Sequence, residues 1–328
     1  MDAISALSSA LRSLEGVRIW ANAPLAPFTT IGTGGKARLL VTVGNVSALA
    51  SILALLESVE VDWFCLGAGS NLLVADRGYE GVVIKLDEGF HYVEGLPASD
   101  DECRTVTLTV GAAAYLARLA AVVAEVGLTG MENACGIPGS VGGGVAMNAG
   151  AHGWCMRDVV WEVEIVTAAG ARWVPAGGLD WGYRYCSLPR RSVVTAVRIA
   201  LEPSDCSIVL DCQRSLLRRR REKQPRSVRT FGSTFKNPPG QHAGRLVEAA
   251  GLKGVRRGGA EISSVHGNFL VNLGDATTAD VLALMALMRQ GVSRTSGIVL
   301  EPEVKLLGAA FPWDLCAESR GEGPAASG

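Results

Sequence analysis

Apolar residues recur along the chain with the two periods that distinguish helices from strands. Helical spacing, in which apolar residues fall three or four positions apart, occurs after Ser47, which can cap a helix, and over residues 278–289. Further helices are expected near residues 1–15, 112–126, 208–221 and 243–250. Short apolar runs predict strands at residues 37–43, 61–66, 72–75, 81–86, 105–110, 159–167, 171–174, 192–201, 268–272 and 299–307. Because helices and strands mix without strict alternation, the pattern favours an α+β fold.

Composition narrows the possible functions. Lys and Arg number 31 against 32 Asp and Glu, so no overall positive field exists to hold nucleic acid. No apolar run reaches the length of a membrane span, and the eight cysteines include no Cys-x-x-Cys pair. We therefore expect a cytoplasmic protein with no nucleic-acid or membrane partner, no metal site and reduced thiols. Glycine is the deviation, because 40 of 328 residues is well above the usual share of about 7%.

The first glycine-rich loop is Gly67-Ala68-Gly69-Ser70-Asn71, directly after a predicted strand. The dinucleotide fingerprint would need a third glycine and a following helix, but Leu72 stands there and the next segment looks extended. A P-loop is excluded because Ala37 follows Lys36 where Ser or Thr is required. Two interpretations stay open: a nest of backbone N–H groups around an anion, or an ordinary tight turn.

The second glycine-rich tract covers residues 136–153 and holds five glycines between Gly136 and Gly144. So many glycines are costly to order, and small side chains let the backbone lie flat against a planar ring or a diphosphate. Two such loops about 70 residues apart suggest one large cofactor between two subdomains. Packing alone is the alternative.

Several motifs, in order, resemble the UDP-N-acetylenolpyruvoylglucosamine reductase family, in its shorter subtype. They are Leu66-Gly67-Ala68-Gly69-Ser70-Asn71-Leu72-Leu73-Val74, Gly136-Ile137-Pro138-Gly139-Ser140-Val141-Gly142-Gly143, Met147-Asn148-Ala149-Gly150-Ala151, Tyr183-Arg184-Tyr185, Gly232-Ser233-Thr234-Phe235-Lys236-Asn237-Pro238 and Leu300-Glu301-Pro302-Glu303-Val304. The resemblance implies a two-subdomain FAD-binding fold of the vanillyl-alcohol-oxidase (PCMH) type and a C-terminal α+β substrate domain. It places the FAD-binding subdomains at residues 17–87 and 88–203, the substrate domain at 204–309 with a last strand returning to the active site, and a disordered tail at 310–328.

The resemblance also implies an activity and its cofactors. The family reduces UDP-N-acetylglucosamine enolpyruvate to UDP-N-acetylmuramate, using NADPH and non-covalently bound FAD, in the synthesis of peptidoglycan precursors. The implied partner is thus a UDP-linked amino sugar, and the implied roles are cell-wall biogenesis, cell shape, the cell cycle and cell division.

Site residues follow from the same motifs, one position at a time. Arg184 would stabilise the charge beside the substrate carboxylate, for which its fixed charge and two parallel donors are suited. Ser233 matches the proton donor and Glu303 the assisting carboxylate. The residues matched to FAD binding are Gly67, Ala68, Gly69, Ser70, Asn71, Gly136, Ser140, Gly142, Gly143 and Asn148. Those matched to substrate binding are Tyr183, Lys223 and Asn237.

Taken alone, these residues have plainer interpretations, and other functions stay open. Arg184 could lie at a strand edge on the surface, and Ser233 could be a turn residue. A second hypothesis is another FAD-dependent oxidoreductase on the same fold, such as an alcohol oxidase. A third is a nucleotide- or RNA-binding protein that uses the arginines between residues 214 and 229, although no aromatic residues are interleaved with them.

Overall fold

The computed structural model describes residues 3–97 and 105–314. The chain divides into two compact units. Unit 1 comprises Met1–Ala21, Leu39–Ala68 and Gly81–Glu222, and unit 2 comprises Asn22–Arg38, Gly69–Glu80 and Lys223–Gly328. Each unit has its own cluster of buried apolar side chains. Residues 81–222 lie together in unit 1. The predicted boundary between two subdomains at residues 87–88 stays a prediction.

A four-stranded sheet with the order β1-β2-β5-β3 carries the first part of the chain. Its elements are α1 (Ala3–Arg12), β1 (Val17–Pro24), η1 (Ala26–Phe28), β2 (Lys36–Val43), α2 (Val46–Ser58), β3 (Trp63–Leu66) and β5 (Tyr79–Leu86). Helix α2 buries Leu49, Ile52, Leu53 and Leu56, as its apolar spacing predicts. Its N-cap is Asn45 rather than Ser47, because the Asn45 side chain accepts a hydrogen bond from the Ala48 N–H.

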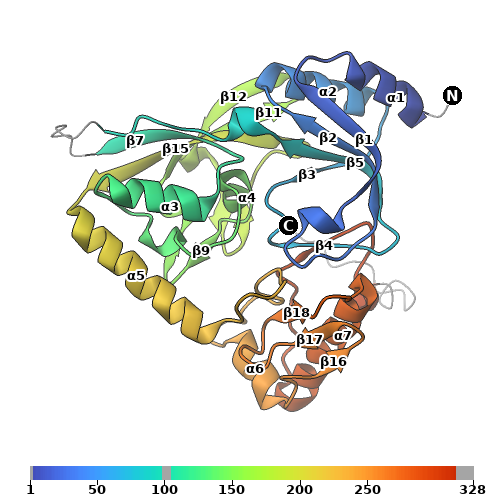
Figure 1. Ribbon diagram of the computed structural model, residues 1–328, viewed down its shortest axis with the longest axis vertical. Coiled ribbons are helices and arrows are strands. Elements are labelled where there is room, and N and C mark those ends of the chain that lie inside the picture. The colour runs from blue at the N-terminus through green and yellow to red at the C-terminus, as the bar shows by residue number, and fades with distance from the viewer. Residues whose placement is uncertain (1–2, 98–104, 315–328) are drawn as a thin grey trace. The chain divides into compact units, whose positions relative to one another are not determined.

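A six-stranded sheet carries most of the remainder of unit 1, with β12-β11-β15-β7-β6 in order and β8 paired to β15. The strands are β6 (Val93–Glu94), β7 (Val106–Gly111), β8 (Leu128–Thr129), β11 (Val160–Thr167), β12 (Gly170–Pro175) and β15 (Val193–Pro203). Around them lie η2 (Glu88–Phe90), α3 (Leu116–Glu125), η3 (Glu132–Ala134), α4 (Val141–Ala146), η4 (Met156–Asp158), η5 (Ala176–Gly178) and α5 (Cys206–Lys223). Figure 1 shows α3 and α4 beside strands β7 and β15. Two short hairpins pair β9 (Gly150–Ala151) with β10 (Trp154–Cys155), and β13 (Trp181–Gly182) with β14 (Tyr185–Cys186).

Unit 2 combines a parallel pair, a small sheet and two helices. The pair joins β4 (Leu72–Val74) to β19 (Lys305–Leu307), and the sheet has the order β16-β17-β18. The strands of this sheet are β16 (Arg256–Arg257), β17 (Ala260–Ile262) and β18 (Leu270–Asn272), and the two helices are α6 (Ala243–Ala249) and α7 (Thr278–Ser296). Helix α7 begins with a capping box formed by Thr277 and Asp280.

The structure changes the extent of predicted elements and adds a helix that the sequence pattern did not predict. Helix α7 continues past residue 289 to Ser296, because Gly291 and Val292 still face the core and the left-handed Gly297 ends it. The predicted strand 299–307 is a strand only at Lys305–Leu307, since Pro302 has no N–H to donate and makes a single bridge to Phe235. In the second glycine tract, Val141–Ala146 forms a helix capped by Ser140.

The predicted disordered tail at 310–328 falls mostly outside the described residues. Its first part, residues 310–314, is described, and the rings of Phe311 and Trp313 stack there with their centroids 5.0 Å apart.

Candidate functional site

A cavity of about 120 Å³ in unit 1 brings the two glycine-rich loops together. Its wall includes Gly67 and Ala68 from the first loop, and Ser140, Gly142 and Gly143 from the second. The other lining residues are Cys65, Leu66, Lys85, Leu86, His91, Ala112, Ala113, Tyr115, Ala146, Leu188, Ser192, Val193 and Val194. Five residues matched to FAD binding are therefore neighbours in space.

Ser140 is the point where the two loops meet. Its hydroxyl accepts a hydrogen bond from the Gly143 N–H at 3.3 Å and so caps α4. A Cβ atom added to Gly67 would lie 2.5 Å from this Ser140 Oγ, and one added to Gly143 would lie 3.2 Å from it. At Gly143 no other atom of residues 3–97 and 105–314 lies within 4 Å of that position beyond the local helix backbone. Glycine at position 67 thus permits the contact between the loops, whereas glycine at position 143 leaves space.

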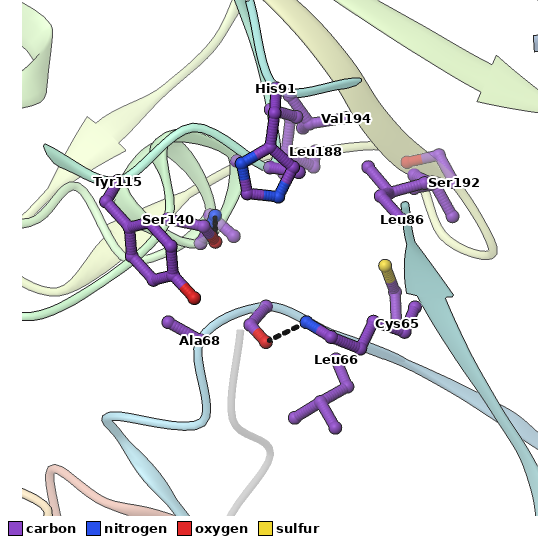
Figure 2. Close-up of a pocket in the computed structure, with 18 residues that line it drawn as sticks. Cys65, Leu66, Ala68, Leu86, His91, Tyr115, Ser140, Leu188, Ser192 and Val194 are labelled. Atoms are coloured by element: carbon purple, nitrogen blue, oxygen red, sulfur yellow. Dashed lines mark hydrogen bonds between the residues drawn. The ribbon is translucent and has the colours of Figure 1, made fainter. Parts of the chain in front are cut away.

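The cavity wall combines apolar side chains with a few polar groups. Figure 2 shows the rings of His91 and Tyr115 on one side and Leu66 and Ala68 on the other. The two ring centroids are 5.9 Å apart and the planes are tilted by 57°. Lys85 Nζ lies 3.5 Å from the Gly67 carbonyl oxygen, to which it donates. Such a wall of backbone, apolar and aromatic groups suits a planar heterocycle, so the residues present fit a flavin nucleotide.

The Cys65 thiol also lines the cavity, and it stays protonated. Burial raises the pKa of Cys65 to about 12, although the nearby Lys85 ammonium lowers the pKa in part. Because the thiolate is the reactive form of cysteine, this residue is unsuited to nucleophilic chemistry. Sequence reasoning did not select Lys85, His91 or Tyr115, because none of them belongs to a motif and their spacing carries no signal.

The remaining residues matched to FAD binding make contacts within the protein. Gly69 has φ +65° and a Cβ there would overlap the carbonyl oxygen of Phe28, so its glycine is required by the fold itself. The Asn71 side chain donates to the Glu303 carbonyl oxygen at 3.1 Å, within unit 2. A Cβ on Gly136 would lie 2.7 Å from Arg220 Cδ. The roles of Gly69, Ser70, Asn71 and Gly136 toward a cofactor stay predictions.

The Asn148 side chain forms its hydrogen bonds with the protein backbone. Its side-chain amide donates to the Gly182 carbonyl oxygen at 3.0 Å and accepts from the Arg157 N–H at 3.1 Å. The residue is buried, with 6% of its surface exposed. Both polar atoms of this side chain therefore have protein partners.

Tyr183 and Arg184 form the turn of the β13–β14 hairpin in unit 1. Gly182 pairs with Tyr185 across the hairpin, and Arg184 has φ +60°, a left-handed conformation that costs energy for a residue other than glycine. The Arg184 guanidinium carbon lies 4.9 Å from the centroid of the Tyr183 ring. Backbone strain of this kind is found at active sites and ligand-binding turns.

Ser233 and Glu303 lie on adjacent segments in unit 2. Ser233 bridges to Phe269, and the Glu303 N–H donates to the Thr234 carbonyl oxygen at 2.9 Å. Asn268 clamps the same segment, because its side chain accepts from the Phe235 N–H at 3.0 Å and donates to the Phe235 carbonyl oxygen at 2.8 Å. Asn268 is buried, so this pair of hydrogen bonds fixes the backbone beside Ser233.

The two polar residues matched to substrate binding in unit 2 precede and follow this segment in the sequence. Lys223 is the last residue of α5 and is exposed. The Asn237 side chain accepts from the Ala243 N–H at 3.0 Å at the start of α6. Lys236, beside Asn237, forms an ion pair with Glu301 at 2.5 Å.

Two further properties concern residues 3–97 and 105–314. No group of three or more His, Cys, Asp or Glu side chains in these ranges could hold a metal ion. Within the same ranges, no helix has both the length and the apolarity needed to cross a membrane.

Comparisons with known proteins cover both units. Residues 37–174 match a family model described as an FAD binding domain, and residues 224–307 match the C-terminal domain of UDP-N-acetylenolpyruvoylglucosamine reductase. The FAD-binding fold of the PCMH type and the separate C-terminal domain, both expected from the sequence, are thereby confirmed.

Proteins similar to this chain along most of its length are UDP-N-acetylenolpyruvoylglucosamine reductases. The UDP-N-acetylenolpyruvoylglucosamine reductase of Anaeromyxobacter sp. (strain Fw109-5) is 48% identical over 90% of this chain and 90% of its own length. That of Bacillus subtilis (strain 168) is 39% identical over 91% of this chain and 97% of its own. A crystal structure of the reductase from Thermus caldophilus has 36% identity and a TM-score of 0.74, and covers 89% of this chain and 98% of that one. With such identity along nearly the whole length, the chain belongs to the UDP-N-acetylenolpyruvoylglucosamine reductase family.

Proposed function

We propose that this protein reduces UDP-N-acetylglucosamine enolpyruvate to UDP-N-acetylmuramate, with NADPH as reductant and FAD as its bound cofactor. The reaction supplies a precursor of peptidoglycan. The observation that carries the proposal is the cavity at which both glycine-rich loops meet around Ser140, in a chain that matches this family over nine tenths of its length. UDP-sugars and NADPH are intracellular metabolites, so we place the enzyme in the cytoplasm.

The cofactor would lie against the backbone wall of the cavity. Gly67, Ala68, Ser140, Gly142 and Gly143 would hold it without a covalent link. When bound, FAD supplies the two-electron transfer between NADPH and the enolpyruvyl carbon. The residues Gly69, Ser70, Asn71 and Gly136 are proposed to contribute to its binding through backbone groups.

Three side chains are proposed to act on the substrate. The Arg184 guanidinium stabilises the negative charge that develops beside the substrate carboxylate, because it remains charged and offers two parallel donors. Ser233 Oγ delivers a proton to the neighbouring carbon, held by the backbone clamp of Asn268. The Glu303 carboxylate assists that proton transfer. Tyr183, Lys223 and Asn237 contact the UDP-sugar.

The test separates the two half-reactions of the purified protein. In one sample, acid denaturation should release the flavin from the protein. In the native protein, the flavin should lose its visible absorbance when NADPH is added without oxygen and regain it on addition of the enolpyruvyl UDP-sugar. A flavin that NADPH reduces but that only oxygen reoxidises would refute the proposed substrate. It would support an oxidase on the same fold instead.

A further inference from the structure

The side chain of Asn148 lies where sequence matching expects a cofactor contact, yet it reaches the hairpin that carries Arg184. Its amide nitrogen donates to the Gly182 carbonyl oxygen at 3.0 Å. Gly182 is the last residue of β13 and directly precedes the turn of Tyr183 and Arg184. Both residues lie in unit 1.

The other end of the Asn148 side chain is anchored as firmly. The side-chain oxygen accepts from the Arg157 N–H at 3.1 Å, and the backbone N–H of Asn148 donates to the Val145 carbonyl oxygen at 3.0 Å at the end of α4. Asn148 has φ +38°, a conformation that asparagine tolerates better than most residues. Asn148 is thus fixed to helix α4, which forms one wall of the cavity, through its backbone, and to the base of the hairpin through its side-chain amide.

The hairpin needs such a support because it is short and strained. Two residue pairs form its ladder, Trp181 with Cys186 and Gly182 with Tyr185, and Asp180 and Ser187 add two hydrogen bonds of 2.7 and 2.9 Å at its base. A short two-stranded hairpin is marginal by itself, and Arg184 adds a left-handed backbone conformation at its tip. A lost hydrogen bond at Gly182 would thus act directly on the position of Arg184.

We infer that Asn148 is a positioning residue for Arg184, and not a ligand of the cofactor. The inference rests on the proposed function, in which Arg184 stabilises negative charge on the substrate. Asn148 holds the hairpin so that the guanidinium keeps its place, and it contributes to the substrate half-reaction through Arg184 alone.

The test uses two substitutions at one position. Asn148→Asp keeps the size, the tolerance of positive φ and the acceptor for Arg157, but it replaces the donor to Gly182 with an oxygen. Asn148→Gly keeps the backbone conformation and removes both side-chain hydrogen bonds. The glycine variant keeps the test informative if a buried carboxylate prevents folding.

A matched control exists at Asn45. Its side chain also accepts from a backbone N–H, that of Ala48 at 2.8 Å, and donates to a backbone carbonyl, that of Glu15 at 3.3 Å. Asn45→Asp makes the same chemical change at the start of α2. This control should change no half-reaction.

We expect both Asn148 variants to bind FAD and to be reduced by NADPH within about threefold of the parent. Flavin reoxidation by the enolpyruvyl substrate should slow about 10²-fold, as expected when a catalytic group is misplaced by about 1 Å. The loss should fall mainly on the maximal rate of that half-reaction.

A double-mutant cycle shows whether the effect passes through Arg184. In an Arg184→Ala background, Asn148→Asp should slow reoxidation less than threefold further, because the group that it positions is already gone. A full additional loss in that background would overturn the inference, and so would a loss of FAD that matches the loss of rate. If Arg184→Ala alone leaves reoxidation unchanged, the proposed role of Arg184 fails instead.

Discussion

Substituting alanine for Gly143 tests whether the flavin lies against helix α4. The helix is short, Val141–Ala146, and contains three consecutive glycines. Outside the local helix backbone, the one atom of the described part of the chain that a methyl group at position 143 would meet is Ser140 Oγ, at 3.2 Å. It would therefore project into the space that the cavity leaves open.

The expected effects have opposite signs with and without the cofactor. Without FAD, alanine in place of glycine stabilises a helix by about 1 kcal/mol. Crowding of the Ser140 cap offsets part of this gain, since the cap itself is worth about 1 kcal/mol. With FAD bound, a methyl group forced into a packed contact costs about 1–3 kcal/mol, which lowers affinity by about 5- to 150-fold.

Two measurements separate these effects. Thermal unfolding of the flavin-free protein should give a melting temperature equal to or up to about 4 °C above that of the parent. Titration of the same preparation with FAD, followed by the change in flavin fluorescence, should show the weaker binding. Both values come from one protein sample, so a general folding defect cannot imitate the result.

Gly144→Ala is the matched control on the next residue of the helix. A Cβ there would lie 2.9 Å from Leu116 Cδ1, in the core rather than in the cavity. The flavin-free control protein should melt at a lower temperature than the parent. Unchanged FAD affinity in Gly143→Ala would refute the placement of the cofactor against α4, and a lower melting temperature would show that Ser140 cannot yield.

Three further predictions concern other residues. Ser233→Ala should leave NADPH-driven flavin reduction intact and slow reoxidation by the substrate by about 10²–10⁴-fold. If stopped-flow traces show the same reoxidation rate in the variant and the parent, Ser233 is not the proton donor. Arg184→Lys keeps the charge but loses the paired donors, so the same assay should show a slower substrate half-reaction, and unchanged turnover would place Arg184 outside the site. Hydrogen bonds from the backbone and side chain of Thr277 hold the pKa of Asp280 below its ordinary value. The stabilisation that this carboxylate gives is therefore present above the ordinary pKa of about 3.9 and lost as the pH falls through the lower folded value. Chemical denaturation should show Asp280→Asn less stable than the parent at neutral pH, with the gap closing in acid; a gap independent of pH would contradict this.

The sequence alone determined the elements whose signal is local. The apolar face of α2 was readable because burial follows the helical period. Glycine density marked the two loops that line one cavity, because backbone that must approach another group closely cannot carry a Cβ atom. The family, and with it the fold class, was recognisable because its motifs occur in order along the chain.

Only the tertiary structure decided which partners the polar side chains take. Asn148 matched a cofactor-binding motif, but its side-chain amide bonds to the backbone of Arg157, nine residues away, and of Gly182, 34 residues away. His91 and Tyr115 became visible as cavity residues only when the chain was folded. The physical reason is that a hydrogen bond or a cavity wall depends on where separate segments meet. Local spacing specifies the segments but leaves their contacts open.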